Sequence, residues 1–308
     1  MIIMVEYRNM KFNRNKIFLI FLAIIITIIL GLVFYGQKTA KLLFVGDLNF
    51  DRYMREVINE KGGDFIFSCI GNSLKEADLV IGNLEGPITD NPSVSVGTEI
   101  GSPANYTFTF PPVTAELLHD YNIKLVNIGN NHISNFKESG VVSTKNYLEK
   151  AEVNYFGGIN GDEPIYRTRL GRTNVSFISF NQFGGDTSEK IADKIENENK
   201  NGRLVIVYAH WGEEYGPITD YQKNIAKLFV KSGAKAIIGS HPHIISPSEK
   251  IGDTIIYYSL GNFVFDQYWN SEVRTGLMLE LDIKDSQITI SEHKVVLDRD
   301  GRTCLATN

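Results

Sequence analysis

Five short apolar segments of this chain each end abruptly at polar side chains that can bind a metal ion. In the clearest case, the apolar run 236–238 leads to the motif His241-Pro242-His243. Alternate residues of an extended chain point the same way, so His241 and His243 project from one side. Neutral imidazole is a favoured ligand for zinc, iron and similar metals. Two histidines at a strand end can equally be polar loop residues, so the other segments decide between the two interpretations.

The other four segments share this arrangement. Their apolar runs and terminal polar residues are 42–45 with Asp47, 79–81 with Asn83 and Glu85, 125–128 with Asn131 and His132, and 204–208 with His210. Each polar residue alone is better explained as a helix cap, a turn residue or a satisfied loop side chain. Ligands of open α/β folds, however, gather at the carboxyl ends of strands. We therefore expect the five ends to meet in one cleft.

Helical patterns alternate with these strands. Apolar residues recur at helical spacing in segment 65–77, and a second helix is expected near 138–151. Near the C-terminus, two alternating strands, 276–283 and 287–296, flank Asp285-Ser286 as in a β-hairpin. This order of elements predicts an α/β fold in which two sheets form a sandwich flanked by helices.

The N-terminal segment has a different character. Residues 17–35 carry no charge and are rich in Ile, Leu and Phe. At about 1.5 Å per residue, a helix of this length spans roughly the ~30 Å hydrocarbon core of a bilayer. Basic residues precede this run, and the positive-inside rule keeps that end in the cytoplasm. These basic residues are Arg8, Lys11, Arg14 and Lys16.

A cleaved signal peptide is the alternative interpretation of this segment. Its apolar region would be shorter and would end at a small-x-small cleavage site, for which Thr39-Ala40 is a weak candidate. We favour the uncleaved anchor. The predicted organisation is a cytoplasmic N-terminus (1–16), a single transmembrane anchor in the cell membrane (17–35), a hinge (36–40) and an extracytoplasmic domain (41–308).

Composition restricts the partners and the cysteine chemistry. The net charge of −5 is modest, and no basic block follows the N-terminal segment, which argues against a nucleic-acid partner. The chain has two cysteines, Cys69 and Cys304. A location outside the cell would permit a disulfide between them. Because Cys69 lies within the apolar run 65–70, we favour a buried apolar thiol instead.

A long segment without helical or strand patterning follows Glu85. Residues 89–106 are rich in Ser, Gly, Asn, Pro and Thr, so we predict a loop. Loops of this length in compact domains are commonly lids or binding loops. We expect this loop to be mobile and to border the site.

Taken together, these stretches resemble the CapA (poly-γ-glutamate capsule biosynthesis) family, a branch of the calcineurin-like metallophosphoesterases. Six short motifs carry the resemblance, in the family's order and over about residues 41–266. They are Gly46-Asp47, Asn83-Leu84-Glu85, Asn131-His132, His210-Trp211-Gly212-Glu213-Glu214-Tyr215, His241-Pro242-His243 and Ser259-Leu260-Gly261-Asn262-Phe263. The N-terminal anchor and the extracytoplasmic body also match this family.

The resemblance implies a calcineurin-like two-sheet sandwich with one or two divalent metal ions, of manganese, iron or zinc, at the strand ends. His210 and His241 resemble ligands of one ion, and His243 resembles a ligand of the other. The implied metal ligands are Asp47, Asn83, Glu85, Asn131, His210, His241 and His243. His132 resembles the general acid, and the implied substrate-binding residues are Asn49, Glu213 and Asn262.

The sequence departs from the family pattern at three positions. Asn83 falls where the superfamily has a bridging aspartate, and a neutral amide is a poorer metal ligand; Glu85 could replace it from a different backbone position. Asn49 falls where the superfamily has a histidine and CapA proteins usually have a methionine. Asn135 falls where CapA proteins often have an acid. A weakened or single-metal site is therefore also consistent with the sequence.

Three functions follow from these observations. The first is a membrane-anchored component of a capsule or poly-γ-glutamate system, working with other synthesis subunits and hydrolysing its substrate if the metal site is catalytic. The second is a surface metal-dependent phosphoesterase unrelated to capsule. The third is a protein that binds an anionic polymer or a membrane partner without catalysis. Metal content, together with a generic phosphodiester assay, separates the second function from the third.

Overall fold

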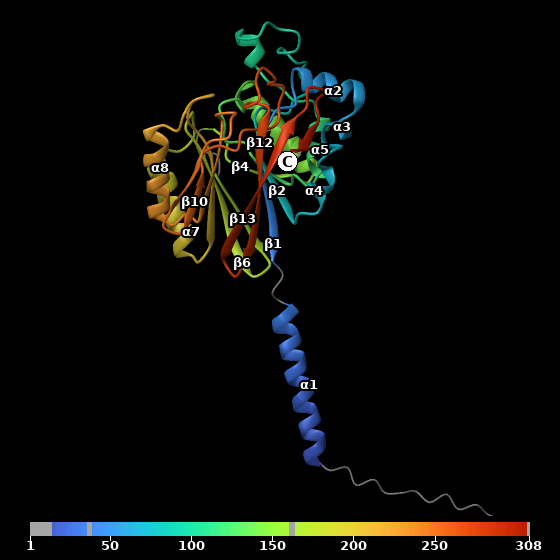
Figure 1. The fold of residues 1–308 in the computed structure, drawn as a ribbon, viewed down its shortest axis with the longest axis vertical. Helices are drawn as coiled ribbons and strands as arrows, with labels where there is room; N and C mark the ends of the chain where they lie inside the picture. Colours follow the sequence, from blue (N-terminus) through green and yellow to red (C-terminus); the bar gives the residue numbers. More distant parts are fainter. Residues whose placement is uncertain (1–13, 36–38, 160–163, 307–308) are drawn as a thin grey trace, which may run out of the picture. The chain divides into compact units, whose positions relative to one another are not determined.

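The computed structural model describes residues 14–35, 39–159 and 164–306. The chain divides into two units, Met1–Lys38 and Thr39–Asn308. The first unit contains helix α1 (Arg14–Tyr35), and the second contains all the other helices and strands described below (Figure 1). Among the described residues, no helix has both the length and the apolar character needed to cross a membrane. The transmembrane anchor therefore stays a prediction.

In the described part of the chain, eight strands form the first sheet, in the order β14-β13-β12-β1-β2-β3-β4 with β11 also paired to β1. Strands β1 to β4 run parallel, and β12 runs antiparallel to β1. The bounds are β1 (Ala40–Leu48), β2 (Leu79–Leu84), β3 (Leu125–Asn127), β4 (Asn154–Phe156), β11 (Asn262–Val264), β12 (Thr275–Lys284), β13 (Gln287–Leu297) and β14 (Thr303–Leu305).

The second sheet comprises six strands of the described chain, in the order β5-β6-β7-β8-β10-β9. Strands β6, β7, β8 and β10 run parallel. The bounds are β5 (Ile165–Leu170), β6 (Thr173–Asn181), β7 (Leu204–His210), β8 (Ala236–Ser240), β9 (Ser248–Ile251) and β10 (Thr254–Tyr257). The parallel strands thus form one half of the first sheet and the centre of the second, and parallel strands gather their carboxyl ends at one edge.

The two sheets pack face to face and helices cover their outer faces. Phe44 and Ile81 of the first sheet share one apolar cluster with Ile206 and Ile238 of the second. A second cluster joins the first sheet to the helices between β1 and β4, and a third joins the second sheet to α7 and α8. The predicted α/β sandwich of two sheets flanked by helices is confirmed. The helices are α2 (Tyr53–Lys61), α3 (Asp64–Phe67), α4 (Gly71–Lys75), η1 (Pro103–Tyr106), α5 (Val113–Asp120), α6 (Lys137–Lys150), α7 (Ser188–Lys200) and α8 (Asp220–Ser232).

Local sequence signals explain several of these elements. Helix α8 begins at a capping box between Thr219 and Gln222 and ends at Gly233, whose left-handed φ of 108° suits glycine. The predicted hairpin joins β12 to β13 through Asp285 and Ser286, which both have positive φ. Positive φ at both central residues is the turn geometry that matches the twist of paired strands.

The predicted helix 65–77 is instead two short helices, α3 and α4, separated by a turn. Cys69 lies in that turn and forms a disulfide with Cys304, with 4.9 Å between the Cα atoms. Cys69 is exposed, so the favoured interpretation as a buried apolar thiol is wrong. The neighbouring Phe67 and Ile70 are fully buried, because the turn rotates these two side chains into the core and Cys69 away from it.

Breaking this disulfide is expected to destabilise the domain strongly. The bond joins residues 235 positions apart, so it constrains a very large loop of the unfolded chain. By loop-closure entropy it contributes about 3–5 kcal/mol. We expect Cys304→Ser to lower the melting temperature by roughly 6–20 °C, as measured by circular dichroism. Reduced wild-type protein should have the same melting temperature as the variant. Equal melting temperatures of reduced and oxidised wild-type protein would contradict the prediction.

Candidate metal centre

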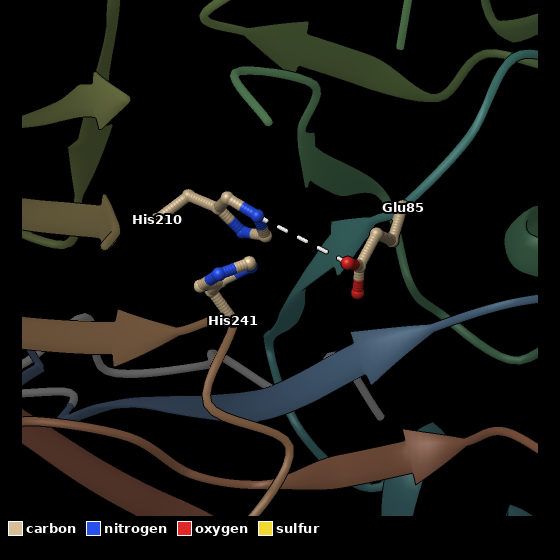
Figure 2. Close-up of side chains that lie close together, drawn as sticks. All are labelled: Glu85, His210 and His241. Carbon is tan, nitrogen blue, oxygen red and sulfur yellow. Dashed lines mark ion pairs between the residues drawn. The ribbon is translucent and has the colours of Figure 1, made fainter. Parts of the chain in front are cut away.

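The carboxyl ends of parallel strands from both sheets meet at one edge of the sandwich. In the first sheet, Asp47 of β1 lies in register with Asn83 of β2. In the second sheet, His210 of β7 lies in register with Ser240 of β8. Figure 2 shows the consequence: Glu85, just past β2, faces His210 and His241 across the space between the sheets.

Two glycines permit the close approach of chain segments at this edge. A Cβ atom at Gly46, just before Asp47, would lie 1.9 Å from the carbonyl oxygen of Gly261. A Cβ atom at Gly239 would lie 2.0 Å from the carbonyl oxygen of Tyr258. Side chains at these positions would push the backbones apart, so the glycines of both motifs are required by the packing.

The polar side chains form two groups that share one carboxylate. Glu85, His210 and His241 offer one group of ligand atoms, and Asp47, Glu85 and His243 offer the other. Within each group, the ligand atoms all lie within 4.8 Å of one another. A carboxylate common to two groups is the arrangement that lets one side chain hold two neighbouring ions.

Glu85 is the central residue of this cluster. Its side chain is fully buried, and neither carboxylate oxygen has a hydrogen-bond partner. Its Oε1 lies 3.7 Å from His243 Nε2 and 4.0 Å from His210 Nε2. These distances are too long for hydrogen bonds, and an unpaired buried carboxylate is costly. They suit atoms that share a metal, because two ligands each about 2.1 Å from one ion lie about 3–4 Å apart. The donor set therefore fits a divalent cation.

Burial also determines the protonation of these groups. Burial, and then the charge of Asp47, raise the pKa of Glu85 well above its usual value. Burial lowers the pKa of His210 well below its usual value, that of His241 to about 4 and that of His132 to about 3. The imidazoles are therefore neutral near pH 7, which is the form that binds metals.

Hydrogen bonds behind the imidazoles orient two of them. His210 Nδ1 lies 3.1 Å from Ser240 Oγ, and His243 Nδ1 lies 2.9 Å from Asn262 Oδ1. These contacts leave each Nε2 facing Glu85, as partners behind metal-binding histidines generally do. His241 and His243 also have φ values of 94° and 59°, a left-handed region that non-glycine residues adopt infrequently.

Asn262 therefore has a role different from the predicted substrate binding. Its side chain is fully buried behind His243. Its amide nitrogen donates to Gln267 Oε1 and to the carbonyl of Val273, at 3.0 Å each. With all its polar atoms bonded inside the protein, Asn262 orients an imidazole and does not face a substrate.

Asn83 holds Asp47 in place. Its amide nitrogen donates to Asp47 Oδ1 at 2.8 Å, and its oxygen accepts from Asn127 Nδ2 at 2.9 Å and from Asn130 Nδ2 at 3.3 Å. An oxygen that already accepts two hydrogen bonds has no lone pair left for a cation. Glu85 thus occupies the shared position that the resemblance assigned to Asn83.

Sequence reasoning missed the buried amides behind this residue. Asn127 accepts a hydrogen bond from Ser179 Oγ at 2.6 Å, which links the first sheet to the second. Asn130 accepts from the backbone N–H groups of His132 and Ile133 and so shapes the turn after β3. Asn127 could have been found from the sequence, because it is an amide inside the otherwise apolar run 125–128.

Asn131 and His132 occupy different places around the centre. Asn131 Oδ1 lies 2.8 Å from His210 Nε2, on the side of the His210 and His241 group. His132 Nε2 lies 4.0 Å from Glu85 Oε1, and its ring packs on Phe108. His132 Nδ1 lies 3.2 Å from the amide nitrogen of Asn135.

That contact determines which nitrogen of His132 carries the proton. The Asn135 amide group also donates to the carbonyl of Tyr106 at 2.8 Å. Because an amide nitrogen is only a donor, His132 Nδ1 accepts and the proton resides on Nε2. The Nε2–H group faces the centre, as a proton donor requires.

Asn49 and Glu213, the two other residues predicted to bind substrate, belong to neither group of ligand atoms. Asn49 is buried, its Oδ1 accepts from the backbone of Asp51, and its amide nitrogen has no partner. Glu213 is exposed. After burial and Asp47, it is the neighbouring Glu214 that raises the pKa of Glu85. Glu214, rather than Glu213, is therefore the acid whose charge reaches the centre.

The long loop 89–106 borders the centre, as predicted. Its last residue, Tyr106, accepts the hydrogen bond from Asn135 described above. Asn105 Oδ1 accepts from Arg52 Nη1 at 3.2 Å. The mobility of this loop stays a prediction.

The lowered pKa values predict acid sensitivity of the metal-free protein. A histidine whose pKa is lower in the folded state loses its stabilising contribution as the pH falls from about 6.5 toward the folded value. The raised pKa of Glu85 acts oppositely, because its contribution is present below about 4.5 and is lost as the pH rises. Three imidazoles outweigh one carboxyl. We expect stability in EDTA to fall between pH 6.5 and 4.5, by up to about 1.4 kcal/mol per pH unit per imidazole.

Urea unfolding at pH 7.0, 6.0 and 5.0 measures this slope. Replacing Glu85 by glutamine removes the opposing group, so the Glu85→Gln variant should lose stability more steeply on acidification. Stability that rises from pH 6.5 to 4.5 in the wild-type protein would contradict the assignment of neutral, buried histidines.

Comparison with known proteins places this geometry in a family. Residues 41–267 match the family described as bacterial capsule synthesis protein PGA_cap. The PGA biosynthesis protein CapA of Bacillus subtilis (strain 168) is 27% identical over 270 residues, which cover 81% of this chain and 69% of that protein. The capsule biosynthesis protein CapA of Bacillus anthracis is 27% identical over 273 residues, which cover 80% of this chain and 64% of that protein.

Among solved structures, the sulfate thiohydrolase SoxB of Thermus thermophilus aligns over 86% of this chain and 56% of its own. The TM-score is 0.47 and the identity 11%, a likeness too low to bear on function. The family match covers most of the domain and all the strand ends that form the centre. The chain therefore belongs to the bacterial capsule synthesis protein PGA_cap family.

Proposed function

We propose that this chain is a membrane-anchored, extracytoplasmic component of capsule biosynthesis, with poly-γ-glutamate as its polymer and a divalent metal centre at the strand ends. The observation that carries the proposal is Glu85, a buried carboxylate without a hydrogen-bond partner that is shared by two groups of metal-capable side chains. Membership of a capsule-synthesis family supports the biological setting. The name of the Bacillus subtilis relative supports the polymer.

The residues of the centre would divide between two ions. His210, His241 and Asn131 would hold one, Asp47 and His243 would hold the other, and Glu85 would contact both. Nitrogen and oxygen donors of this kind suit manganese, iron and zinc. When bound, such ions polarise a substrate oxygen and lower the pKa of water. As the acid, His132 would donate an Nε2–H hydrogen bond to the leaving oxygen of a phosphoester or the leaving nitrogen of a γ-glutamyl amide, and the proton released by the attacking water would end on that leaving atom.

Three features support the membrane location. Residues 17–35 are uncharged and basic residues precede them. The Cys69–Cys304 disulfide belongs in an oxidising compartment outside the cytoplasm. The working partners would then be the membrane and other subunits of the capsule system.

Protease treatment of intact cells tests this topology. We expect a protease to digest the part of the chain after Lys38 and to spare the residues before Lys16, because only the former would be exposed outside the cell. Immunoblots with one tag at each terminus report the two parts separately. Digestion of the body only after cell lysis would contradict the extracytoplasmic placement.

Capsule production tests the function itself. In the native host, we expect His241→Ala to abolish surface polymer, because His241 belongs to the centre. His293→Ala is the matched control: this histidine lies on β13, 3.8 Å from Glu280 and outside the centre. Surface polymer at wild-type level in a His241→Ala strain whose protein has lost its metal would show that the metal centre is not needed for capsule synthesis.

A further inference from the structure

Arg52 lies beside the candidate metal centre in an unusual backbone conformation. It immediately precedes α2 and has a φ of 51° and a ψ of −128°. Non-glycine residues hold such conformations only where the surrounding structure determines them, and these cases cluster at functional sites.

Two aromatic rings pack against the guanidinium group, and each of them also packs on an imidazole of the centre. The guanidinium carbon lies 5.1 Å from the ring centre of Phe108 and 5.4 Å from that of Phe265. The Phe108 ring lies 4.4 Å from that of His132, and the Phe265 ring lies 4.9 Å from that of His243. Arg52 thus shares its aromatic neighbours with a candidate ligand and the candidate acid.

The polar contacts of Arg52 leave part of its donor capacity unused. Its Nη2 forms an ion pair with Asp266, and its Nη1 donates to Asn105 Oδ1. Its Nε is buried and has no hydrogen-bond partner. A guanidinium group has five N–H donors in a planar fork, which suits the oxygens of phosphate and carboxylate groups. Asp266 and Asn105 fix the orientation of the fork, and because the side chain is 13% exposed, the second N–H groups of Nη1 and Nη2 remain as donors for a further anion.

The negative charge at the centre is small beside the charge of the ions that it would hold. Asp266 balances the charge of Arg52, while Asp47 and Glu85 supply only two negative charges for as many as two divalent ions. A loaded centre beside Arg52 would therefore carry excess positive charge, which an anionic ligand would balance.

We propose that Arg52 forms an anion-binding subsite of the metal centre, which holds the phosphoryl or carboxylate oxygens of the substrate. The proposal rests on the metal centre proposed above and adds the class of ligand that the centre takes. Phe108 and Phe265 hold the guanidinium plane, and Asp266 and Asn105 set its direction. Phosphate esters and γ-linked glutamate chains share the anionic oxygens that this subsite would bind.

The variants must remove the subsite without unfolding the domain. Arg52→Gln alone would leave Asp266 buried and unpaired, which is strongly destabilising. The double variant Arg52→Gln/Asp266→Asn removes both charges together. Asp266→Asn alone keeps Arg52 and tests whether the ion pair itself matters. Arg172→Gln is the control, because Arg172 is exposed in the turn between β5 and β6.

The experiment uses the full chain in detergent, with and without loaded manganese. Metal content is measured by mass spectrometry, and calorimetry gives the Kd for inorganic phosphate and for a short γ-glutamyl oligomer. We expect the double variant to keep wild-type metal content and to bind phosphate, the oligomer or both at least tenfold more weakly. Arg172→Gln should stay within threefold of wild type, and Asp266→Asn, which keeps Arg52 but removes the partner that sets its direction, should fall between wild type and the double variant. Weaker binding of phosphate indicates a phosphoryl substrate, and weaker binding of the oligomer indicates a γ-glutamyl substrate.

The outcomes separate the two proposals. Equal Kd values for both ligands in the wild type and the double variant, at equal metal content, would overturn the subsite. Failure of the wild-type chain to bind metal would overturn the proposed metal centre instead. Phosphate binding that still depends on Arg52 in EDTA would then support the subsite alone.

Discussion

The Glu85→Gln variant will lose its bound metal and will, at the same time, be more stable than the wild type when both are metal-free. The loss of metal follows from the position of Glu85 in both groups of ligand atoms. Changes to residues behind metal ligands already lower affinity by about 10–100-fold, so loss of the shared carboxylate should exceed about 100-fold. His241→Ala, by contrast, removes a ligand of one group only.

The gain in stability has a separate cause. Without a cation, the Glu85 carboxylate is buried and has no partner, and burial raises its pKa well above the usual value. An amide of the same shape carries no charge to desolvate. We therefore expect the metal-free variant to be more stable by roughly 1–3 kcal/mol at pH 8, where the wild-type carboxyl is most ionised.

Metal analysis and urea unfolding in EDTA measure these two effects. Glu213→Gln is the matched control, because Glu213 is an exposed acid of the same type and should change neither quantity. A Glu85→Gln variant that keeps its metal would contradict the shared-ligand assignment. A metal-free variant less stable than the wild type would show that Glu85 has a stabilising partner of its own.

His132→Ala is expected to lower turnover of a phosphodiester with an alkoxide leaving group by about 10²–10⁴-fold, because such a leaving group depends on a hydrogen-bond donor and a proton. Bound metal should remain at the wild-type level, because His132 belongs to neither group of ligand atoms. The structure supports this division of roles: Asn135 contacts His132 Nδ1 and leaves the Nε2–H group facing the centre.

His241→Ala is the comparison variant, because it should lose bound metal and turnover together, whereas His132→Ala should lose turnover alone. His119→Ala, on α5 and away from the centre, is the control for loss of a histidine. Retained activity in His132→Ala with metal still bound would refute the role of His132 as the acid and leave the metal centre intact. Asn135→Ala should show a smaller loss of turnover, because it removes the partner that holds the His132 proton on Nε2.

The two-sheet sandwich and the edge where the centre lies could be predicted from the residue pattern. Apolar runs long enough for buried strands alternate with helical patterns, and parallel strands place their carboxyl ends together. Asp47, His210 and His241 therefore meet in the structure, as their spacing predicts. The hairpin at Asp285-Ser286 could also be predicted from the sequence, because the conformation of a two-residue turn depends on its own residues.

Only the tertiary structure decided which polar side chain does what at that edge. Asn83 and Glu85 lie two residues apart in one motif, yet Asn83 is saturated by amides from β3 and the turn after it, and Glu85 has no partner. Likewise, Asn262 faces an imidazole rather than a substrate.

Tertiary packing also assigned the roles of Cys69 and Arg52, which no pattern of neighbouring residues indicated. Cys69 pairs with a cysteine 235 residues away, and Arg52 is held by Phe265 and Asp266 from a distant segment of the chain. Periodicity and turn chemistry are properties of neighbouring residues and determine elements and their ends. The partner of each buried polar group is chosen where segments far apart in sequence pack together, and that choice assigns its role.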